Sequence, residues 1–186
     1  MNPTDVRITT ELLWQATLFF ALADLIIVPL LAWRIPNLRF RRLPRWLAGV
    51  ALIVWMAIWF SAIAGFWETV YRYIFPGWAH WVVPIAFPAL DAAVALLLWL
   101  LAQRLPGRSA AWFCLFSGVW GSLTHVWAVS LGITEKPPML QGASPAAAIV
   151  FAFFEYMLYF NGILALAALL ESIIKMEPRI NADSRG

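Results

Sequence analysis

The sequence contains little charge and no polar segment long enough to form a domain in water. Only 12% of its 186 residues are charged, 63% are hydrophobic, and the mean hydropathy is +0.78. An average soluble domain is about half apolar and about a quarter charged. This composition excludes a soluble enzyme, a secreted disulfide scaffold and a disordered regulator. It predicts an integral, multi-pass membrane protein, located in the plasma or inner membrane if the source is bacterial, with residues 1–186 forming a single transmembrane domain.

Cysteine and histidine are almost absent, which limits metal and cofactor chemistry. Cys114 is the single cysteine, so no intramolecular disulfide can form. No set of cysteines and histidines has the spacing of a structural metal site. A haem held by two histidines needs imidazoles on facing helices, but His80 lies beside Trp78 and Trp81, where we expect the membrane interface. We therefore expect no metal and no cofactor.

Long apolar runs, by contrast, are abundant. A helix needs about 20 apolar residues to cross roughly 30 Å of hydrocarbon. Five runs are long enough, namely 11–34, 46–74, 81–103, 109–132 and 146–174. Proline, glycine or both lie between successive runs, where they favour turns. The sequence therefore predicts an all-α bundle of five transmembrane helices.

Lysine and arginine are distributed unevenly between the two sets of loops. Three lie in one set, namely Arg7, Arg72 and Lys136. Ten lie in the other set, namely Arg34, Arg39, Arg41, Arg42, Arg45, Arg104, Arg108, Lys175, Arg179 and Arg185. Cytoplasmic loops carry the excess of basic residues, so we expect the N-terminus outside and the C-terminus in the cytoplasm. This topology explains the net charge of +3 better than nucleic-acid binding does.

Each predicted span contains a residue that hydrocarbon disfavours. These residues are Asp24, Glu68, Asp91, His125 and Glu155. An acidic group at a helix centre costs about 2.5–3.5 kcal/mol, so such residues normally face the protein interior, pair with another group or take part in function. At 1.5 Å per residue they lie from about 9 to 20 Å below the outer boundary. We expect one shared cavity, lined by Asp91, His125 and Glu155, with Glu68 or Asp24 nearby.

Structural roles for two of these residues remain open. Glu68 lies four residues before Arg72, so the two can form a local ion pair on one helix. Asp24 can serve as a hydrogen-bonding group between helices.

Small and polar residues accompany the ionisable ones at helical spacing. Ser117, Gly118 and Gly121 recur on the helical face that carries His125, and small residues allow helix backbones to approach closely in lipid. In the last span Tyr159 shares a face with Glu155, and Asn161 adds a polar group nearby.

Tryptophan is frequent, with twelve residues, and several lie inside spans rather than at their ends. Trp67, Trp120 and Trp127 are such residues. They fit either ordinary packing or a flat apolar slot for a ring-bearing lipid or pigment. Aromatic faces also stabilise positive charge, so a slot with carboxyl groups and an imidazole could protonate an alkene and shield the resulting cation.

Over residues 46–174 the pattern resembles the emopamil-binding-protein and sigma-2-receptor (EXPERA) membrane family. The resemblance is carried by Phe66-Trp67-Glu68-Thr69, by Asp91, by Ser117-Gly118-Val119-Trp120-Gly121 with His125, and by Phe153-Phe154-Glu155-Tyr156. It implies a small helical membrane protein with acidic residues in a lipophilic pocket, and some members of the family isomerise sterol double bonds. Ala64 stands where the family has a histidine, His125 where it has an acid and Glu155 where it has an amide.

Two functional hypotheses follow, and whether the protein is an enzyme stays open between them. In the first, the chain binds a sterol-, isoprenoid- or pigment-like molecule and acts as an isomerase or cyclase. Glu68 or Asp91 would then donate a proton, and His125 or Glu155 would remove one. The expected ligand-binding residues are Asp24, Trp67, Trp120, Trp127, Tyr159 and Asn161.

In the second hypothesis, the chain is a non-catalytic subunit of a membrane redox or light-harvesting complex. The expected partners are membrane lipid or a lipophilic small molecule and no nucleic acid, with a homodimer or a membrane complex left open. An ion channel is disfavoured because polar groups are expected in the outer half of the membrane only.

Overall fold

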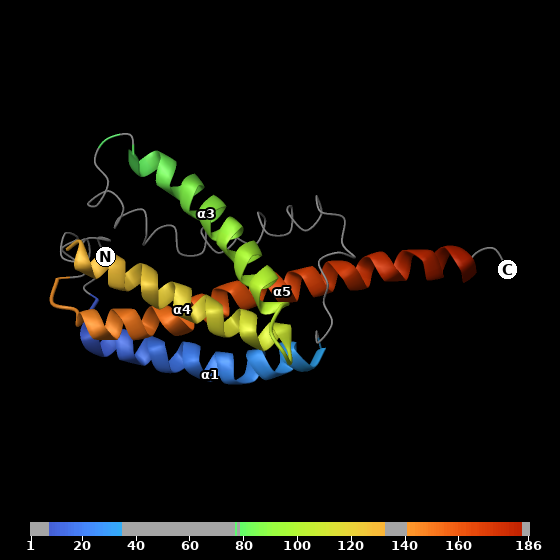
Figure 1. Cartoon of the computed structure of the whole chain (residues 1–186), viewed down its shortest axis with the longest axis horizontal. Coiled ribbons are helices and arrows are strands. Elements are labelled where there is room, and N and C mark those ends of the chain that lie inside the picture. Colours follow the sequence, from blue (N-terminus) through green and yellow to red (C-terminus); the bar gives the residue numbers. More distant parts are fainter. Residues whose placement is uncertain (1–7, 35–76, 78, 133–140, 184–186) are drawn as a thin grey trace, which may run out of the picture.

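The computed structural model describes residues 8–34, 77, 79–132 and 141–183. They form four helices and no strand: α1 (Thr10–Arg34), α3 (Ala79–Ala102), α4 (Ser109–Ser130) and α5 (Pro145–Asp183) (Figure 1). The all-helical class predicted from the sequence is confirmed for this part of the chain. The predicted span 46–74 lies outside the described residues.

The observed helix bounds follow the predicted spans closely, except at the end of α5. α1, α3 and α4 agree with 11–34, 81–103 and 109–132 to within two residues at each end. The turn after α4 contains Gly132 at φ 63°, a left-handed conformation that glycine adopts without strain and that commonly ends a helix. α5 begins one residue before the predicted 146 but continues nine residues beyond 174, to Asp183. The prediction followed the apolar run, whereas helical structure does not require apolar side chains.

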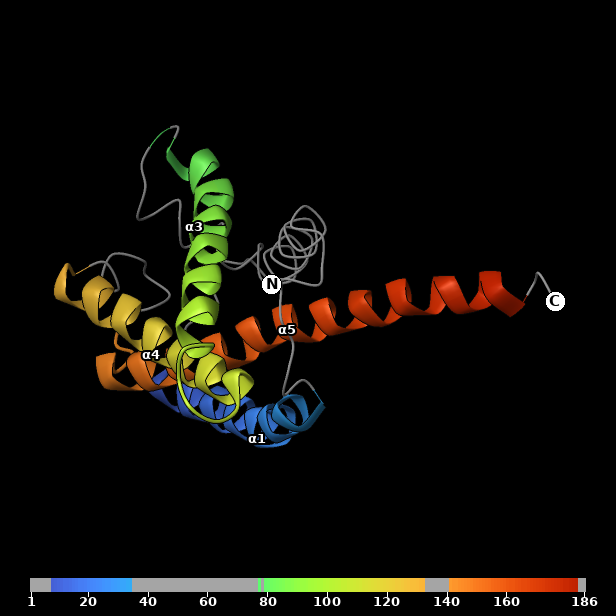
Figure 2. The same cartoon turned by 45° about the vertical axis from the view of Figure 1, so that its right-hand side comes forward.

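Three helices lie side by side, and the fourth crosses them. α4 packs on α5 most extensively, α1 packs on α5 and on α4, and α3 packs on α4. α1 and α5 run in the same direction and α4 runs opposite to them, while α3 crosses obliquely (Figures 1 and 2). At 1.5 Å per residue α5 is about 58 Å long and α4 about 33 Å. The C-terminal part of α5 therefore extends beyond the other helices (Figure 1).

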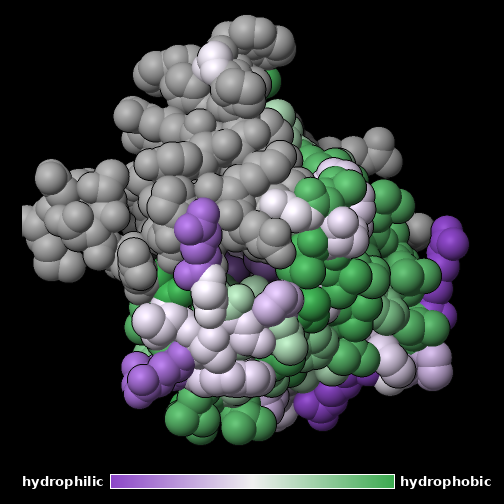
Figure 3. All heavy atoms as spheres, turned by 90° about the vertical axis from the view of Figure 1, so that its left-hand side faces the viewer, coloured by the Kyte–Doolittle hydropathy of each residue, from purple (hydrophilic) through white to green (hydrophobic). Residues whose placement is uncertain are grey.

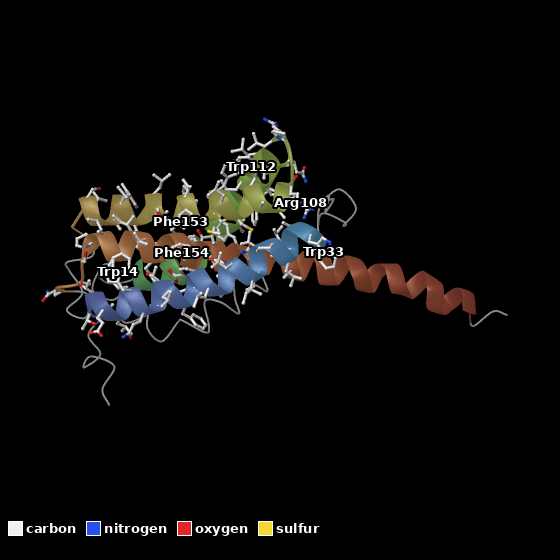
Figure 4. All side chains as sticks on the ribbon, turned by 90° about the horizontal axis from the view of Figure 1, so that it is seen from below. Trp14, Trp33, Arg108, Trp112, Phe153 and Phe154 are labelled. Atoms are coloured by element: carbon white, nitrogen blue, oxygen red, sulfur yellow. The ribbon has the colours of Figure 1, made fainter. Side chains whose placement is uncertain are left out.

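Hydrogen bonds link the helices at both ends of the bundle. At one end the backbone N–H of Ser144, just before α5, donates to Thr10 Oγ1 at the start of α1 over 2.9 Å. At the other end Arg108, just before α4, donates from Nη1 to the carbonyl oxygen of Ala32 over 3.1 Å. This bond satisfies a carbonyl in the last turn of α1, where a cation is also favoured by the helix dipole. Figure 4 shows Arg108 and Trp33 at this end and Trp14 at the opposite end.

Glycine allows α4 and α5 to approach closely. A Cβ added at Gly121 would collide with the carbonyl oxygen of Ala152 and would lie 2.6 Å from Cβ and Cγ of Tyr156. A Cβ added at Gly118 would lie 2.8 Å from the ring of Phe153. The sequence prediction that the small residues of this span allow close helix packing is therefore confirmed for Gly118 and Gly121.

The largest group of buried side chains lies where the end of α3 meets α4 and α5. Trp99 of α3 meets the edge of Phe113 of α4 at a centroid distance of 5.5 Å. Phe113 stacks on Phe160 of α5 at 6.1 Å. All three side chains are at most 1% exposed. Aromatic contacts therefore fix the crossing of α3 over the other two helices.

The outward faces of the helices are strongly apolar. On α1 the exposed fractions reach 67% for Phe19 and 70% for Leu25 and Ile26, and on α4 Trp127 is 64% exposed. Figure 3 shows apolar side chains over much of the visible surface of the described helices. Within the described part of the chain, one segment, Thr10–Trp33 of α1, is long and apolar enough to cross a membrane, with a hydropathy of 2.1. The other predicted spans stay a prediction.

Candidate functional site

Two carboxyl groups from different helices approach each other inside the bundle. Asp91 lies in the middle of α3, and Glu155 lies in the third turn of α5. Their carboxyl groups are close enough to interact electrostatically. Glu155 is only 7% exposed, and Asp91 is partly buried. Buried carboxyl groups from two helices cost free energy unless each is neutralised or paired, which makes this pair a candidate for chemistry rather than packing.

Trp120 of α4 supplies a hydrogen-bond donor beside this pair. Its indole N–H interacts with the Asp91 carboxyl group. Trp120 Nε1 is buried, and no acceptor other than Asp91 is found for it among the described residues. We call Asp91, Trp120 and Glu155 the carboxyl–indole site.

Aromatic rings of α5 flank the carboxyl–indole site. Tyr156 follows Glu155 directly, and its ring lies 5.9 Å from that of Tyr159 and 5.8 Å from that of Phe160. Tyr159 is 3% exposed, which places its ring inside the bundle as the sequence analysis expected for a residue on the face of Glu155. Ring faces of this kind attract positive charge that develops on a nearby molecule.

His125 joins this group through an aromatic ring. Its Nδ1 lies 3.1 Å from the carbonyl oxygen of Gly121, four residues earlier on α4. Its ring meets the edge of Tyr156 at a centroid distance of 6.4 Å. The structure thus brings Asp91 and Glu155 together and places His125 beside Tyr156, nearer to the end of α4.

Asp24 belongs to a second polar group, which is built from three helices. Asn161 of α5 donates from Nδ2 to Asp24 Oδ1 of α1 over 3.3 Å. The thiol of Cys114 on α4 donates to Asn161 Oδ1. Asp24, Asn161 and Cys114 are 3%, 1% and 0% exposed. We call these three residues the Asp24 network, and its bonds connect α1, α4 and α5.

The two polar groups lie at different depths. Counting 1.5 Å per residue, Glu155 is about 15 Å from the start of α5, whereas Asn161 is about 24 Å from it. Asp24 is about 21 Å from the start of α1, and the starts of α1 and α5 are hydrogen-bonded to each other. The predicted position of these residues in the outer half of the membrane stays a prediction. The Asp24 network lies deeper, because its partner on α5 is almost two turns beyond Glu155.

The remaining predicted residues are Trp127, Glu68 and Trp67. Trp127 is 64% exposed on α4. Glu68 and Trp67 lie outside the described residues. Among the described residues no group of three or more histidine, cysteine or acidic side chains could hold a metal ion.

Two members of these groups, Cys114 and Tyr156, were not predicted from the sequence. Cys114 lies four residues before Gly118 and seven before Gly121, so extending the small-residue face by one turn would have revealed it. Tyr156 was not singled out, although it follows Glu155, contacts His125 and packs on Gly121. The available signal was that Tyr156 lies between two predicted residues, Glu155 on its own helix and His125 on the adjoining one.

Comparison with models of known protein families, with curated proteins and with solved structures finds no match to this chain. Two carboxyl groups near each other can divide acid and base roles between them, one donating a proton and the other accepting one. Trp120 and the tyrosine rings add a hydrogen-bond donor and faces that favour cations.

Proposed function

We propose that the chain is a multi-pass membrane protein with five transmembrane helices, its N-terminus outside and its C-terminus in the cytoplasm. The bulky apolar side chains exposed on α1 and α4 support a location in the membrane, because such surfaces are rare on soluble monomers. The alternating directions of α1, α4 and α5 also fit a chain that crosses the membrane repeatedly (Figure 1). The same alternation brings the basic residues Arg34 and Arg108 to one end.

Within this protein, the carboxyl–indole site binds a lipophilic molecule and transfers protons on it, as an isomerase or cyclase would. The single observation that carries this proposal is the approach of the Asp91 and Glu155 carboxyl groups from separate helices beside a buried indole. A likeness to the EXPERA family is part of the proposal, since that family combines acidic residues with a lipophilic pocket.

The proposed chemistry moves a double bond without any net change in composition. A neutral carboxyl group, on Asp91, adds its proton to one carbon of the alkene and becomes a carboxylate, and the adjacent carbon becomes cationic. The faces of Trp120 and Tyr156 stabilise this cation. The carboxylate of Glu155 then takes a proton from a carbon on the other side of the cation, which forms the new double bond. Proton exchange between the two carboxyl groups restores the starting state.

The first test is mass spectrometry of molecules that co-purify with the protein in mild detergent. A monodisperse preparation of the single chain carrying one class of isoprenoid, sterol or pigment supports the proposal. A chain that aggregates alone but purifies with other membrane proteins, with no such molecule bound, contradicts it and favours the subunit hypothesis.

The second test uses the two carboxyl groups. The molecule identified by mass spectrometry is incubated with wild-type protein, and formation of its double-bond isomer or cyclised product is followed by chromatography. Asp91→Asn and Glu155→Gln keep the side-chain volume, and each should reduce product formation at least about a hundredfold, the usual contribution of a general acid or base. Glu11→Gln, at an exposed position in α1, is the matched control and should retain full activity. Full activity in both site variants would refute the proposal.

A further inference from the structure

We infer that the Asp24 network is a proton-binding site, in which a proton on Asp24 Oδ2 keeps α1 packed on α5 and α4. The carboxyl–indole site plays no part in this inference, which therefore does not depend on the proposed chemistry. The observation behind it is a buried oxygen atom that the network leaves open. Asp24 is 3% exposed, and its Oδ2 is buried without a hydrogen-bond partner among the described residues.

The hydrogen bonds of the network determine which oxygen of Asp24 can carry the proton. The thiol of Cys114 donates to Asn161 Oδ1, and this bond turns the amide so that its Nδ2 faces Asp24. That nitrogen donates to Asp24 Oδ1 over 3.3 Å. An amide N–H can only donate, so Oδ1 serves as the acceptor. A proton bound to this carboxyl group therefore lies on Oδ2.

The basic residues of the described helices and loops lie far from Asp24 along the chain axis. On α1 the next one follows ten residues later, about 15 Å along the helix, and on α5 the first lies fourteen residues beyond Asn161, about 21 Å along. The others stand in the loop before α4, from which Arg108 reaches the last turns of α1. These residues are Arg34, Arg104, Arg108, Lys175 and Arg179.

The titratable groups that face Asp24 from the neighbouring helices supply no positive charge either. Cys114 of α4 is close enough to Asp24 to interact with it electrostatically, and a thiol is neutral or negative. On α5 the nearest acidic group is Glu155, almost two turns from Asn161. An ionised Asp24 would thus be a buried charge with one neutral donor, which is disfavoured far more than a neutral acid.

A proton suits the open oxygen better than a metal ion does. A hard metal ion takes about six oxygen ligands. Within the Asp24 network, Oδ2 is the one carboxyl or amide oxygen that accepts no hydrogen bond from another member. A proton needs only this atom. Its loss would leave a carboxylate inside the contact between α1, α4 and α5, so we expect the packing of α1 to weaken when Asp24 ionises.

The first test is the infrared spectrum of the full-length protein in detergent near neutral pH. A neutral carboxylic acid gives a C=O band that is separate from the bands of a carboxylate and that shifts in heavy water. We expect Asp24→Asn to lose one such acid band. Glu11→Gln, at an exposed position on the same helix, is the matched control and should lose carboxylate bands instead. Loss of carboxylate bands in Asp24→Asn would overturn the inference.

The second test is the dependence of Tm on pH. The native state holds a proton that the unfolded state, with Asp24 in water, releases well below neutral pH. Stability therefore falls as pH rises, and between about pH 6 and 8 the Tm of wild type should fall by about 3 °C per pH unit relative to Asp24→Asn. The other carboxyl groups are common to both proteins. Equal pH dependence of the two proteins would overturn the inference.

If Asp24→Asn does not fold, isotope labelling replaces it. Protein carrying Asp91→Asn is prepared with aspartate whose side-chain carboxyl carbon is a heavy isotope. An acid band that moves with this label supports the inference, because the aspartate of the carboxyl–indole site has been removed. The absence of any acid band that moves with the label would overturn it, and the proposed function would be unaffected.

Discussion

The contact between α4 and α5 allows a sharp test, because two glycines on one helix face different atoms of the other helix. A Cβ at Gly121 would meet the backbone oxygen of Ala152 and Cβ and Cγ of Tyr156, and the first two of these atoms cannot move without moving α5. A Cβ at Gly118 would meet the ring of Phe153 and Cγ of Met157 at 2.8 and 2.9 Å, and these side chains can rotate. Alanine at these two positions should therefore have unequal effects.

The expected changes in the free energy of unfolding follow from two opposing contributions. Overpacking costs about 1–3 kcal/mol, and alanine recovers about 1 kcal/mol of helix propensity relative to glycine. Gly121→Ala lies at the upper end of the first range, so it should reduce the free energy of unfolding by about 2 kcal/mol. For a chain of this length that corresponds to a fall in Tm of about 4–8 °C. For Gly118→Ala the two contributions nearly cancel, and Tm should stay within about 2 °C.

The protein carries its own reporter for this measurement. Cys114 is the single cysteine in the sequence and is 0% exposed. Thermal unfolding in detergent can therefore be followed by the reaction of its thiol with a fluorescent maleimide, and neither substitution touches the cysteine itself. A Gly121→Ala variant as stable as wild type, or a Gly118→Ala variant that is the less stable of the two, would refute the packing of α4 on α5 described above.

Three further predictions use the same assay or a topology assay. Arg108→Ala removes the charged donor to the Ala32 carbonyl and should lower Tm by about 3 °C. Arg104→Ala, in the same loop, should leave Tm unchanged. Equal effects of the two substitutions would contradict the hydrogen bond from Arg108 to Ala32. Asp24→Asn keeps an oxygen that can accept from Asn161 and should leave Tm within about 2 °C, while Asp24→Leu leaves that amide without its acceptor and should lower Tm by about 5 °C. Equal loss in both Asp24 variants would show that the charge matters rather than the hydrogen bond. Reporter fusions after the α3–α4 loop and at the C-terminus should both report cytoplasm, and an external signal from either would refute the topology.

Helix positions were largely predictable from the sequence, because apolar runs and their proline and glycine boundaries are local properties. The end of α5 was not predictable in this way, since Glu171 and Lys175 end the apolar run without ending the helix. The run identifies the segment that favours lipid, and backbone hydrogen bonding determines how far the helix continues. The end of the apolar run and the end of the helix coincide only where a helix ends at the membrane surface.

The acidic residues of the site were predictable from the sequence, but which of them meet was not. Residue type and depth singled out Asp24, Asp91 and Glu155, because an acidic residue in an apolar helix is costly wherever it points. Which of them meet depends on how the helices are rotated and offset along their axes. Asp24 pairs with Asn161 rather than with the other carboxyl groups because α5 presents that amide almost two turns beyond Glu155. Single-sequence periodicity contains no information on that offset.

The pairing of α1 with α5 also constrains the order in which the molecule can be assembled. Asp24 and Asn161 are separated by 137 positions, and Thr10 and Ser144 by 134. When the first helix leaves the ribosome, the amide that will bond its carboxyl group has not been synthesised, and neither has the helix against which it packs. A transmembrane segment with an unpaired acid is less stable in lipid than one whose acid is bonded. In the proposed membrane topology the bundle therefore closes only when its last helix arrives, and until then α1 depends on lipid, water or the insertion machinery to accommodate Asp24.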